Sequence, residues 1–483
     1  MVTESWRRAA CYLGHASPPS AMPRSALAGL LCLLPVAAFA QAPAPPATAP
    51  PATDARLHAI AAAPAPAHLR ADVDRLAAFG TRATFSDTVS QTRGIGAARR
   101  WIRAEFERIS AACGGCLDVR EQRTLVPGGA GERIPRDVWV VNVVATQRGT
   151  ERPDHVVLMS GDIDSRGTSA TDGTRDAPGA NDNATGIAGL LEAARVLTQH
   201  RFPASVVYAA LSAEEVGLLG GQHLARQYVA DSVTVLGVLN NDMIGNVCGI
   251  TGDCSSTRFR IFSEATPVTE TDRQRAARRF YGGEVDGPSR QLARYVARLT
   301  ATYLPTLDAR MVYRLDRFGR GGHHRPFNDA GFPGVRIMEA HEHYDRQHQD
   351  LRTETHPDGS PRVFGDTPEF VDPVYAARLT AVNAVALASL AWAPPPPRTV
   401  RISGAVSPST TLEWSPVAAS NLAGYVVYWR DTTAPQWTHR RFVGAVTRAT
   451  LENVVIDDHL FGVAAVSTDG HESIVVFPTE VGR

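Results

Sequence analysis

The sequence predicts an α/β protein with a mostly parallel mixed sheet flanked by helices, followed by a small all-β sandwich. The first observation is that apolar runs typical of buried strands alternate with segments whose apolar residues recur at helical spacing, between about 138 and 393. The second is a run of short alternating segments separated by turn residues over 398–483. The length of 483 residues is sufficient for both units.

The N-terminal region has the features of an export signal. Residues 26–40 form an apolar core after Arg24, and Ala38-Phe39-Ala40 is a small-x-small cleavage site. We therefore expect a signal peptide over 1–40 and a periplasmic or secreted product. We expect no membrane insertion, because this run and all later ones are too short for a span.

The segment that follows, 41–53, is a Pro/Ala-rich linker, and it precedes a large domain predicted over 54–393. The formal net charge of zero gives no reason to expect nucleic acid as a partner. The four cysteines after the signal form two local pairs, and in an exported protein these favour two short disulfides. A zinc site shared by Cys113, Cys116, Cys248 and Cys254 is the alternative.

The large domain is predicted from a regular succession of elements. The expected strands cover 138–145, 155–159, 205–212, 233–240 and 333–338. The expected helices cover 184–199, 216–229 and 372–393. The segment 246–310, which interrupts this alternation, is expected to form a cap over the site.

Acidic residues gather where the predicted strands end. They are Asp162 and Asp164, Glu214 and Glu215, and Asp242, with Asp182 just before a predicted helix. Since the carboxyl ends of parallel strands share one edge of a sheet, these carboxylates should lie together. Such a group needs a compensating cation, and a divalent metal ion is the usual one. Taken alone, Asp182 is equally well explained as a helix N-cap.

Several motifs around these residues occur in one order along the chain. They are SGDIDS (160–165), PGANDNATG (178–186), SAEEVGLLG (212–220), NNDMIG (240–245), GGHHRPFNDAGFPGVR (321–336) and HYDRQHQDLR (343–352). Together they resemble the M28 zinc peptidases, co-catalytic aminopeptidases and their relatives, over roughly 70–390. The resemblance implies a zinc-exopeptidase-like fold and hydrolysis of peptides.

The resemblance also implies roles for individual residues. Asp182 would bridge two divalent ions, of which one is also bound by Asp162 and Glu215 and the other by Asp242 and His348. Zinc is the expected metal. Glu214 would be the general base that acts on the water between the ions.

Some positions near the C-terminal end of the domain keep alternatives open. His343, and to a smaller extent His341, compete with His348 as the ligand. Tyr344 would bind the tetrahedral oxyanion or belong to the core. His323-His324 replaces a pair that is usually Asp-His in the family, and a role in the wall of the site is preferred for it.

One departure from the family concerns its first motif, which is usually His-x-Asp. Here Asp162 stands at the histidine position, so that a carboxylate would ligate directly and Mn or Co becomes an alternative to zinc. Asp164, counted with Glu214 among the catalytic residues, loses the imidazole that it would hold. We expect Arg166 or a backbone N–H to satisfy it instead.

A second interpretation of this departure is a degenerate, binding-only protein. The presence of the other four ligand positions and of Glu214 favours an active enzyme. The expected function is that of an exported dinuclear aminopeptidase acting on peptides. The alternatives are a non-catalytic binding protein, a carboxypeptidase and a glutaminyl cyclase.

The C-terminal segment 398–483 resembles fibronectin type III domains in the pattern LEW…GYVVYW…FGVAAVSTDGHES, with Trp414 as a core residue. No cluster of metal ligands or nucleophiles is apparent in it. Contact with a surface or a carbohydrate, or packing on the large domain, is its expected role.

Overall fold

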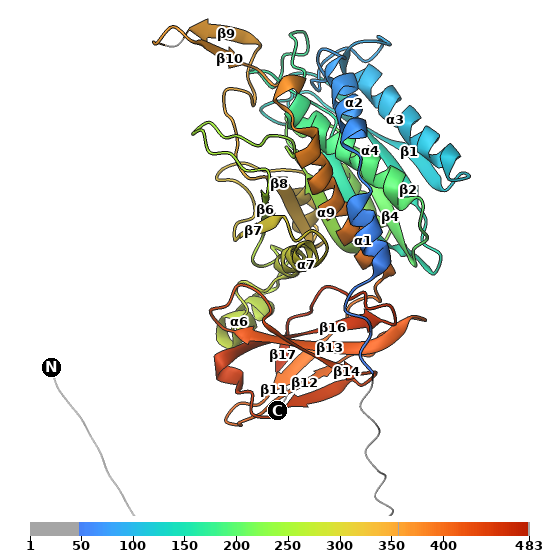
Figure 1. The fold of residues 1–483 in the computed structure, drawn as a ribbon, viewed down its shortest axis with the longest axis vertical. Helices are drawn as coiled ribbons and strands as arrows, with labels where there is room; N and C mark the ends of the chain where they lie inside the picture. Colours follow the sequence, from blue (N-terminus) through green and yellow to red (C-terminus); the bar gives the residue numbers. More distant parts are fainter. Residues whose placement is uncertain (1–47, 356, 482–483) are drawn as a thin grey trace, which may run out of the picture. The chain divides into compact units, whose positions relative to one another are not determined.

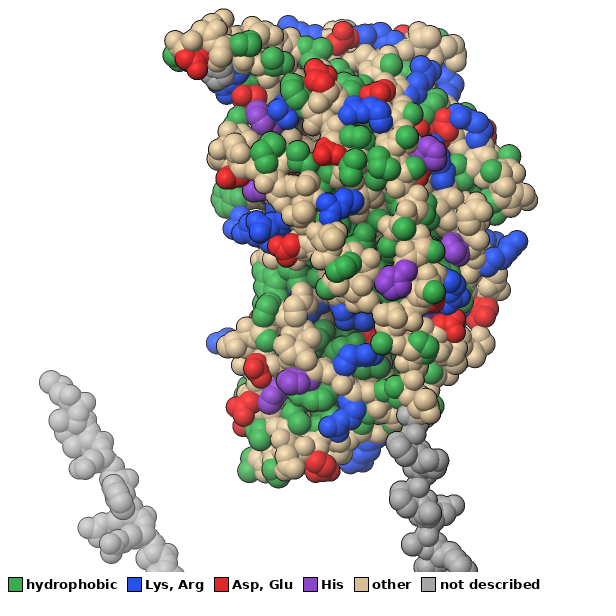
Figure 2. Space-filling view, viewed as in Figure 1, with side chains coloured by type: hydrophobic (Ala, Val, Ile, Leu, Met, Phe, Trp, Pro, Cys, Tyr) green, Lys and Arg blue, Asp and Glu red, His purple; other side chains and the backbone are tan. Residues whose placement is uncertain are grey.

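The computed structural model describes residues 48–355 and 357–481. The predicted signal peptide (1–40) and residues 41–47 of the predicted linker lie outside these residues. Figure 1 shows two kinds of architecture in the described part, a large sheet with helices and a set of antiparallel strands near the C-terminus. Basic and acidic side chains are interspersed over the face drawn in Figure 2, in keeping with the net charge of zero.

The large sheet of the described chain has eight strands, and its mixed character confirms the predicted fold class. In spatial order they are β1 (Leu117–Val126), β2 (Val138–Gln147), β4 (Ala204–Leu211), β3 (Arg152–Asp162), β5 (Thr234–Asn241), β8 (Gly334–Glu339), β6 (Arg258–Ser263) and β7 (Asp308–Val312). The central strands β4, β3, β5 and β8 are parallel to their neighbours in this group. β2 joins β4 antiparallel, and β6 joins β8 antiparallel.

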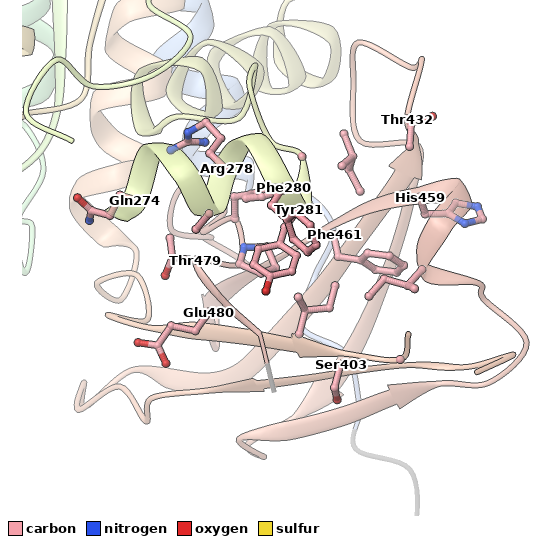
Figure 3. Close-up of a pocket in the computed structure, with 18 of the residues that line it drawn as sticks. Gln274, Arg278, Phe280, Tyr281, Ser403, Thr432, His459, Phe461, Thr479 and Glu480 are labelled. Atoms are coloured by element: carbon pink, nitrogen blue, oxygen red, sulfur yellow. The ribbon is translucent and has the colours of Figure 1, made fainter. Parts of the chain in front are cut away.

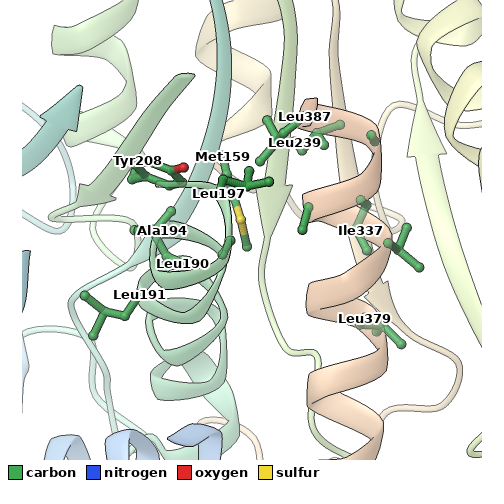
Figure 4. Packing of buried hydrophobic residues seen from close by; sticks show 14 of the residues in the cluster. Met159, Leu190, Leu191, Ala194, Leu197, Tyr208, Leu239, Ile337, Leu379 and Leu387 are labelled. Atoms are coloured by element: carbon green, nitrogen blue, oxygen red, sulfur yellow. The ribbon is translucent and has the colours of Figure 1, made fainter. Parts of the chain in front are cut away.

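Alternate residues of the central strands pack into separate apolar clusters on the two faces of the sheet, which is why these strands are almost continuously apolar. Val157 and Met159 of β3 belong to one cluster, whereas Val156 and Leu158 belong to another. Helices α4 (Thr185–Leu197) and α9 (Pro373–Trp392) cover the first face, as Figure 4 shows. Helices α5 (Leu219–Ala230) and α8 (His324–Asp329) contribute to the second cluster.

Further helices complete the first layer and the connections. They are α1 (Ala55–Ala62), α2 (Pro66–Ala77), α3 (Gly94–Ala112), α6 (Asp272–Tyr281) and α7 (Pro288–Tyr303). A separate hairpin is formed by β9 (Arg352–Thr355) and β10 (Pro361–Phe364). The segment 246–310 was predicted to be a cap, but it supplies β6 and α7 to the sheet and to its apolar cluster.

The length of helix α9 contradicts the expectation that no later segment is long enough to cross a membrane. Within the described residues it is the one helix with sufficient length and apolar composition, and 89% of its most apolar window is buried inside the protein. This burial is explained by its packing between α4, α2 and the sheet.

The predicted all-β unit is present near the C-terminus. One sheet contains β15 (Arg448–Leu451), β12 (Thr410–Trp414), β11 (Val400–Ser403) and β17 (Glu480–Val481). The other contains β14 (His439–Gly444), β13 (Leu422–Asp431) and β16 (His459–Ser467). Trp414 is 5% exposed in the cluster that joins the two sheets. The fibronectin type III likeness of this unit stays a prediction.

The cysteines form the two local disulfides that were preferred, Cys113–Cys116 and Cys248–Cys254. The shared zinc site is therefore excluded as a description of this structure. A buried ionic triad connects α7 with β13: the Asp286 carboxylate lies 2.7 Å from Arg294 and 2.9 Å from Arg430.

Candidate metal centre

The predicted acidic residues lie at one edge of the large sheet. Asp162 is the last residue of β3, Asp242 directly follows β5, and Glu214 and Glu215 lie in the turn after β4. Asp182 lies in the short segment Ala180–Ala184 that leads into α4. It makes no side-chain cap for α4, so the helix-cap interpretation of this residue is wrong.

Three of the predicted ligands form a compact group. The ligand atoms of Asp182, Glu215 and His348 all lie within 4.8 Å of one another. His348 Nε2 is 3.1 Å from Asp182 Oδ2 and 3.2 Å from Glu215 Oε1. The expected pairing of His348 with Asp242 is thus wrong: His348 shares its side of Asp182 with Glu215. Chain order alone does not specify on which side of a shared carboxylate a ligand lies.

Ionic contacts perturb two members of this group in opposite directions. Although burial opposes both shifts, the hydrogen bond and charge of His348 lower the pKa of Asp182. The charge of Glu215 and the hydrogen bonds to Asp182 and Glu215 raise the pKa of His348 to about 9. Two carboxylates and one imidazole this close together form a group that a divalent cation would neutralise.

Strained backbone occurs next to the site. Seven non-glycine residues of the described chain have positive φ, and three of them are His348, Ala213 before Glu214, and Met243 after Asp242. Each costs of order 1 kcal/mol, and such residues cluster at functional sites because the surroundings hold a particular side-chain direction. Here one of them is the ligand His348, and the other two are chain neighbours of Glu214 and Asp242.

Asp366 supports the Asp182 segment and was missed in the sequence. Its carboxylate accepts hydrogen bonds from the backbone N–H groups of Asn181, at 2.8 and 3.0 Å, and Asp182, at 2.6 Å. It is 184 residues from Asp182 along the chain and carries no motif of its own. Gln347 Nε2 also donates to Asp182 Oδ2, at 3.3 Å.

Asp164 holds the turn that carries the two glutamates. It accepts hydrogen bonds from the backbone N–H groups of Glu214, at 3.0 Å, and Glu215, at 3.1 Å, and from Thr84 Oγ1 at 2.9 Å. The backbone alternative of the prediction is therefore confirmed. Arg166 instead lies 3.8 Å from Glu215 Oε2.

Glu214 differs from its neighbour in exposure. Its side chain is partly exposed whereas Glu215 is buried. Although part of the residue is exposed, its carboxyl group lies inside the protein. This burial and the negative charges of Glu215 and Asp242 raise the pKa of Glu214 well above its usual range. A carboxylate with a raised pKa beside the ligand group is suited to accept and return a proton near neutral pH.

Asp162 is engaged on both oxygens by other groups of the chain. Oδ1 lies 2.5 Å from His323 Nδ1, and Oδ2 accepts a hydrogen bond from Asn183 Nδ2 at 2.7 Å. Asp162 is 2% exposed and His323 is fully buried. Burial raises the pKa of Asp162 to about 8 and lowers that of His323 to about 4.

Asp242 is bound by arginine. Its Oδ2 lies 2.8 Å from Arg336 Nη2 and 3.7 Å from Arg317 Nη2. Arg336 is completely buried, and its Nη1 donates to the carbonyl of Gly321 at 2.9 Å. Asp242 and Asp162 thus lie at the predicted edge, but neither belongs to the three-residue group.

The remaining candidates are less directly involved. His324 is fully buried, and its Nε2 lies 2.8 Å from the carbonyl oxygen of Leu315. Its role in the wall of the site stays a prediction. Tyr344 is 56% exposed, so the core alternative is wrong for it. Its proposed oxyanion contact stays a prediction.

The donor set fits one zinc ion. Two carboxylate oxygens and one imidazole nitrogen leave a position open for water or substrate, as in catalytic zinc sites. A cavity with a volume of about 630 Å³ lies elsewhere and is lined by α6 and the C-terminal strands, with Phe280, Tyr281 and Phe461 around it (Figure 3). None of the carboxylates described above lines that cavity.

Known proteins show a consistent similarity. Residues 142–258 match the family described as "Peptidase family M28". A "Probable zinc metalloprotease" of Pyricularia oryzae is 42% identical over 434 residues, which span 88% of this chain and 84% of that protein. Another from Leptosphaeria maculans is 41% identical over 429 residues, or 89% of this chain and 98% of that protein.

Solved structures extend the comparison to the fold. The LapA aminopeptidase of Legionella pneumophila superimposes with a TM-score of 0.50, over 71% of this chain and 77% of that one. At 17% identity, this likeness shows a shared fold.

Proposed function

Because the chain belongs to peptidase family M28, we propose that this zinc metallopeptidase is an aminopeptidase that removes N-terminal residues from peptides. The observation that carries the proposal is the placement of partly exposed Glu214 next to the ligand group Asp182, Glu215 and His348. A base directly beside the ligands is the arrangement that hydrolysis of an amide bond requires.

The chemistry divides between the ion and the chain. Zinc, when bound, polarises the scissile carbonyl and lowers the pKa of the attacking water. Glu214 accepts the proton of that water and delivers it to the leaving amine nitrogen. Asp164 fixes the backbone of Glu214 and Glu215 through two N–H groups, so that base and ligand keep their relative positions.

The charges around the site favour the amino end of a substrate. A terminal ammonium group would be attracted by the carboxylates at this edge of the sheet. A terminal carboxylate would need a free cation, but Arg336 binds Asp242 and Arg317 binds Glu342 at 3.1 Å. Arg320 also binds Glu342, at 3.0 Å. These three arginines are therefore already paired with carboxylates and are less suited to bind the terminal carboxylate that a carboxypeptidase recognises.

The test compares wild type with Glu214→Gln on leucyl and alanyl p-nitroanilides. We expect kcat to fall by roughly 10²–10⁴-fold in the variant, with zinc content unchanged. N-acetylated substrates should resist the wild type. Equal rates for wild type and variant, or equal cleavage of acetylated substrates, would contradict the proposal. Zinc-loaded wild type without activity would indicate a binding protein, and ammonia release from N-terminal glutamine would indicate a cyclase.

Export is part of the same proposal. It is based on the apolar segment 26–40 and the site Ala38-Phe39-Ala40. Mass spectrometry of the protein from its native host should find Gln41 as the first residue, and a retained residue 1–40 segment would contradict it. For the C-terminal strands we propose contact with a surface or carbohydrate, which glycan-array binding would test.

A further inference from the structure

The two positions at which the metal motifs depart from the family contact each other. Asp162 stands where histidine is usual, and His323 stands where aspartate is usual. The structure places Asp162 Oδ1 2.5 Å from His323 Nδ1, although the two are 161 residues apart along the chain. Compared with the usual family pattern, the imidazole and the carboxylate have therefore exchanged positions, and in this structure they contact each other.

Electrostatics explains why the two changes occur together. If only position 162 had changed, a buried aspartate would face a second buried aspartate, and two carboxylates at this distance cannot both ionise without a large cost. With His323 opposite, one oxygen of Asp162 shares a hydrogen bond with the imidazole Nδ1, and Asn183 donates a hydrogen bond to the other oxygen at 2.7 Å. Both oxygens are thus satisfied without a metal ion.

The neighbouring carboxylate also has its own cation. Arg336 lies 2.8 Å from Asp242, and a guanidinium is always protonated in proteins. A second dication bound by Asp242 would lie close to this fixed positive charge and would share its carboxylate with it.

The geometry points to a centre that holds one zinc ion, bound by Asp182, Glu215 and His348, with the Asp162–His323 and Asp242–Arg336 pairs in place of a second ion. Binding of this zinc ion rests on the proposed function, whereas the exclusion of a second ion rests on the two side-chain pairs alone. Among the residues in 48–355 and 357–481, one other set of three potential ligands comes as close together, and it comprises Asp54, Asp469 and His471. That set does not include Asp162 or Asp242, and Arg56 already lies 2.7 Å from Asp469 and 3.3 Å from His471.

Two buried atoms define the competing arrangement. Asp242 Oδ1 and His323 Nε2 have no hydrogen-bond partner among the residues that the structure describes. A second ion would use one or both of them as ligands, since each oxygen of Asp162 already has a hydrogen-bond partner. Zinc stoichiometry separates the two arrangements without any reference to activity.

The experiment loads the full chain with zinc sulfate, removes free metal by gel filtration, and counts zinc by mass spectrometry against protein concentration. We expect one ion per chain in wild type and one in Asp162→Asn. Glu215→Gln, which lacks a ligand, should fall well below one and gives the background of surface-bound metal. Two ions in wild type, or loss of an ion in Asp162→Asn, would overturn the inference.

The exchange itself can be reversed. In the double variant Asp162→His/His323→Asp the imidazole returns to position 162 while the buried contact is kept, and we expect zinc to rise to two ions per chain. A count that stays at one would show that the exchange is not the cause. A wild type with two ions and full peptidase activity would refute this inference alone, whereas one ion without peptidase activity would refute the proposed function alone.

Discussion

Asp366 provides a demanding test of how the metal centre is built, because it touches the centre only through the backbone. Its carboxylate accepts hydrogen bonds from the N–H groups of Asn181 and Asp182. The variant Asp366→Ala removes both acceptors at once. The segment that presents the Asp182 side chain then loses its anchor while the three ligands remain.

The magnitude follows from these contacts. A buried N–H group left without a partner costs about 1–3 kcal/mol, so the free energy of unfolding should fall by roughly 3 kcal/mol. For the roughly 430 residues that the structure describes, this lowers Tm by roughly 3 °C. Mutation of a group that orients a metal ligand typically lowers metal affinity by about 10–100-fold, and we expect the zinc affinity of Asp366→Ala to fall in this range.

Zinc affinity is measured by competition with a chelating dye, and Tm by scanning fluorimetry in the metal-free protein. The matched control is Asp372→Ala, since Asp372 also accepts two backbone N–H bonds, from Val374 at 2.9 Å and Tyr375 at 3.0 Å. Loss of this helix cap should cost about 1 kcal/mol and leave zinc affinity unchanged. Unaltered zinc affinity in Asp366→Ala, or an equal loss in both variants, would refute the reasoning.

The remaining predictions concern stability. Burial raises the pKa of Glu264 to about 7 from 4.5, so its contribution is present below pH 4.5 and is lost as pH rises through 7. Glu264→Gln should therefore raise the free energy of unfolding by about 2 kcal/mol at pH 8, a value reduced because the side chain is partly exposed, and leave it unchanged at pH 4.5. An equal gain at both pH values in thermal melts would contradict this. Asp286→Ala leaves Arg294 and Arg430 buried without a counter-charge and should cost about 3–5 kcal/mol in the same melts, whereas Asp308→Ala, which breaks an exposed pair with Arg258, should cost less than about 1 kcal/mol. Similar losses in both variants would argue against an ionic role of the triad. Chelation of zinc should lower Tm by about 4 °C if the ion is present at about 1,000 times its Kd, with recovery on adding zinc, and a Tm that does not respond would show that zinc does not bind the folded state.

The central part of the fold could be predicted because its strands are covered on both faces. The apolar runs at 155–159, 205–212 and 233–240 correspond to β3, β4 and β5, and the acidic residues after them lie at one edge as expected. β6 and β7 escaped prediction because they are short and carry polar residues, such as Arg258 and Asp308, at alternate positions. β6 pairs with β8, which comes much later in the chain, and among the described strands β7 pairs only with β6.

The contacts of the site were harder to predict than its residues. The residue types at strand ends identify a metal site, but the grouping of His348 with Glu215 depends on how the loop after β8 folds back. The support from Asp366 and the contact of His323 with Asp162 join residues that are 184 and 161 positions apart. No local pattern reports such contacts, since they depend on the packing of separate loops.

The central claim is that Asp182, Glu215 and His348 hold the zinc ion. The most direct measurement is a crystal structure of the zinc-loaded protein with anomalous data collected on both sides of the zinc edge. We predict one strong zinc peak, about 2.0–2.2 Å from a carboxylate oxygen of Asp182, a carboxylate oxygen of Glu215 and a nitrogen of His348. A peak bound elsewhere, or a second peak bound by Asp242, would contradict the account.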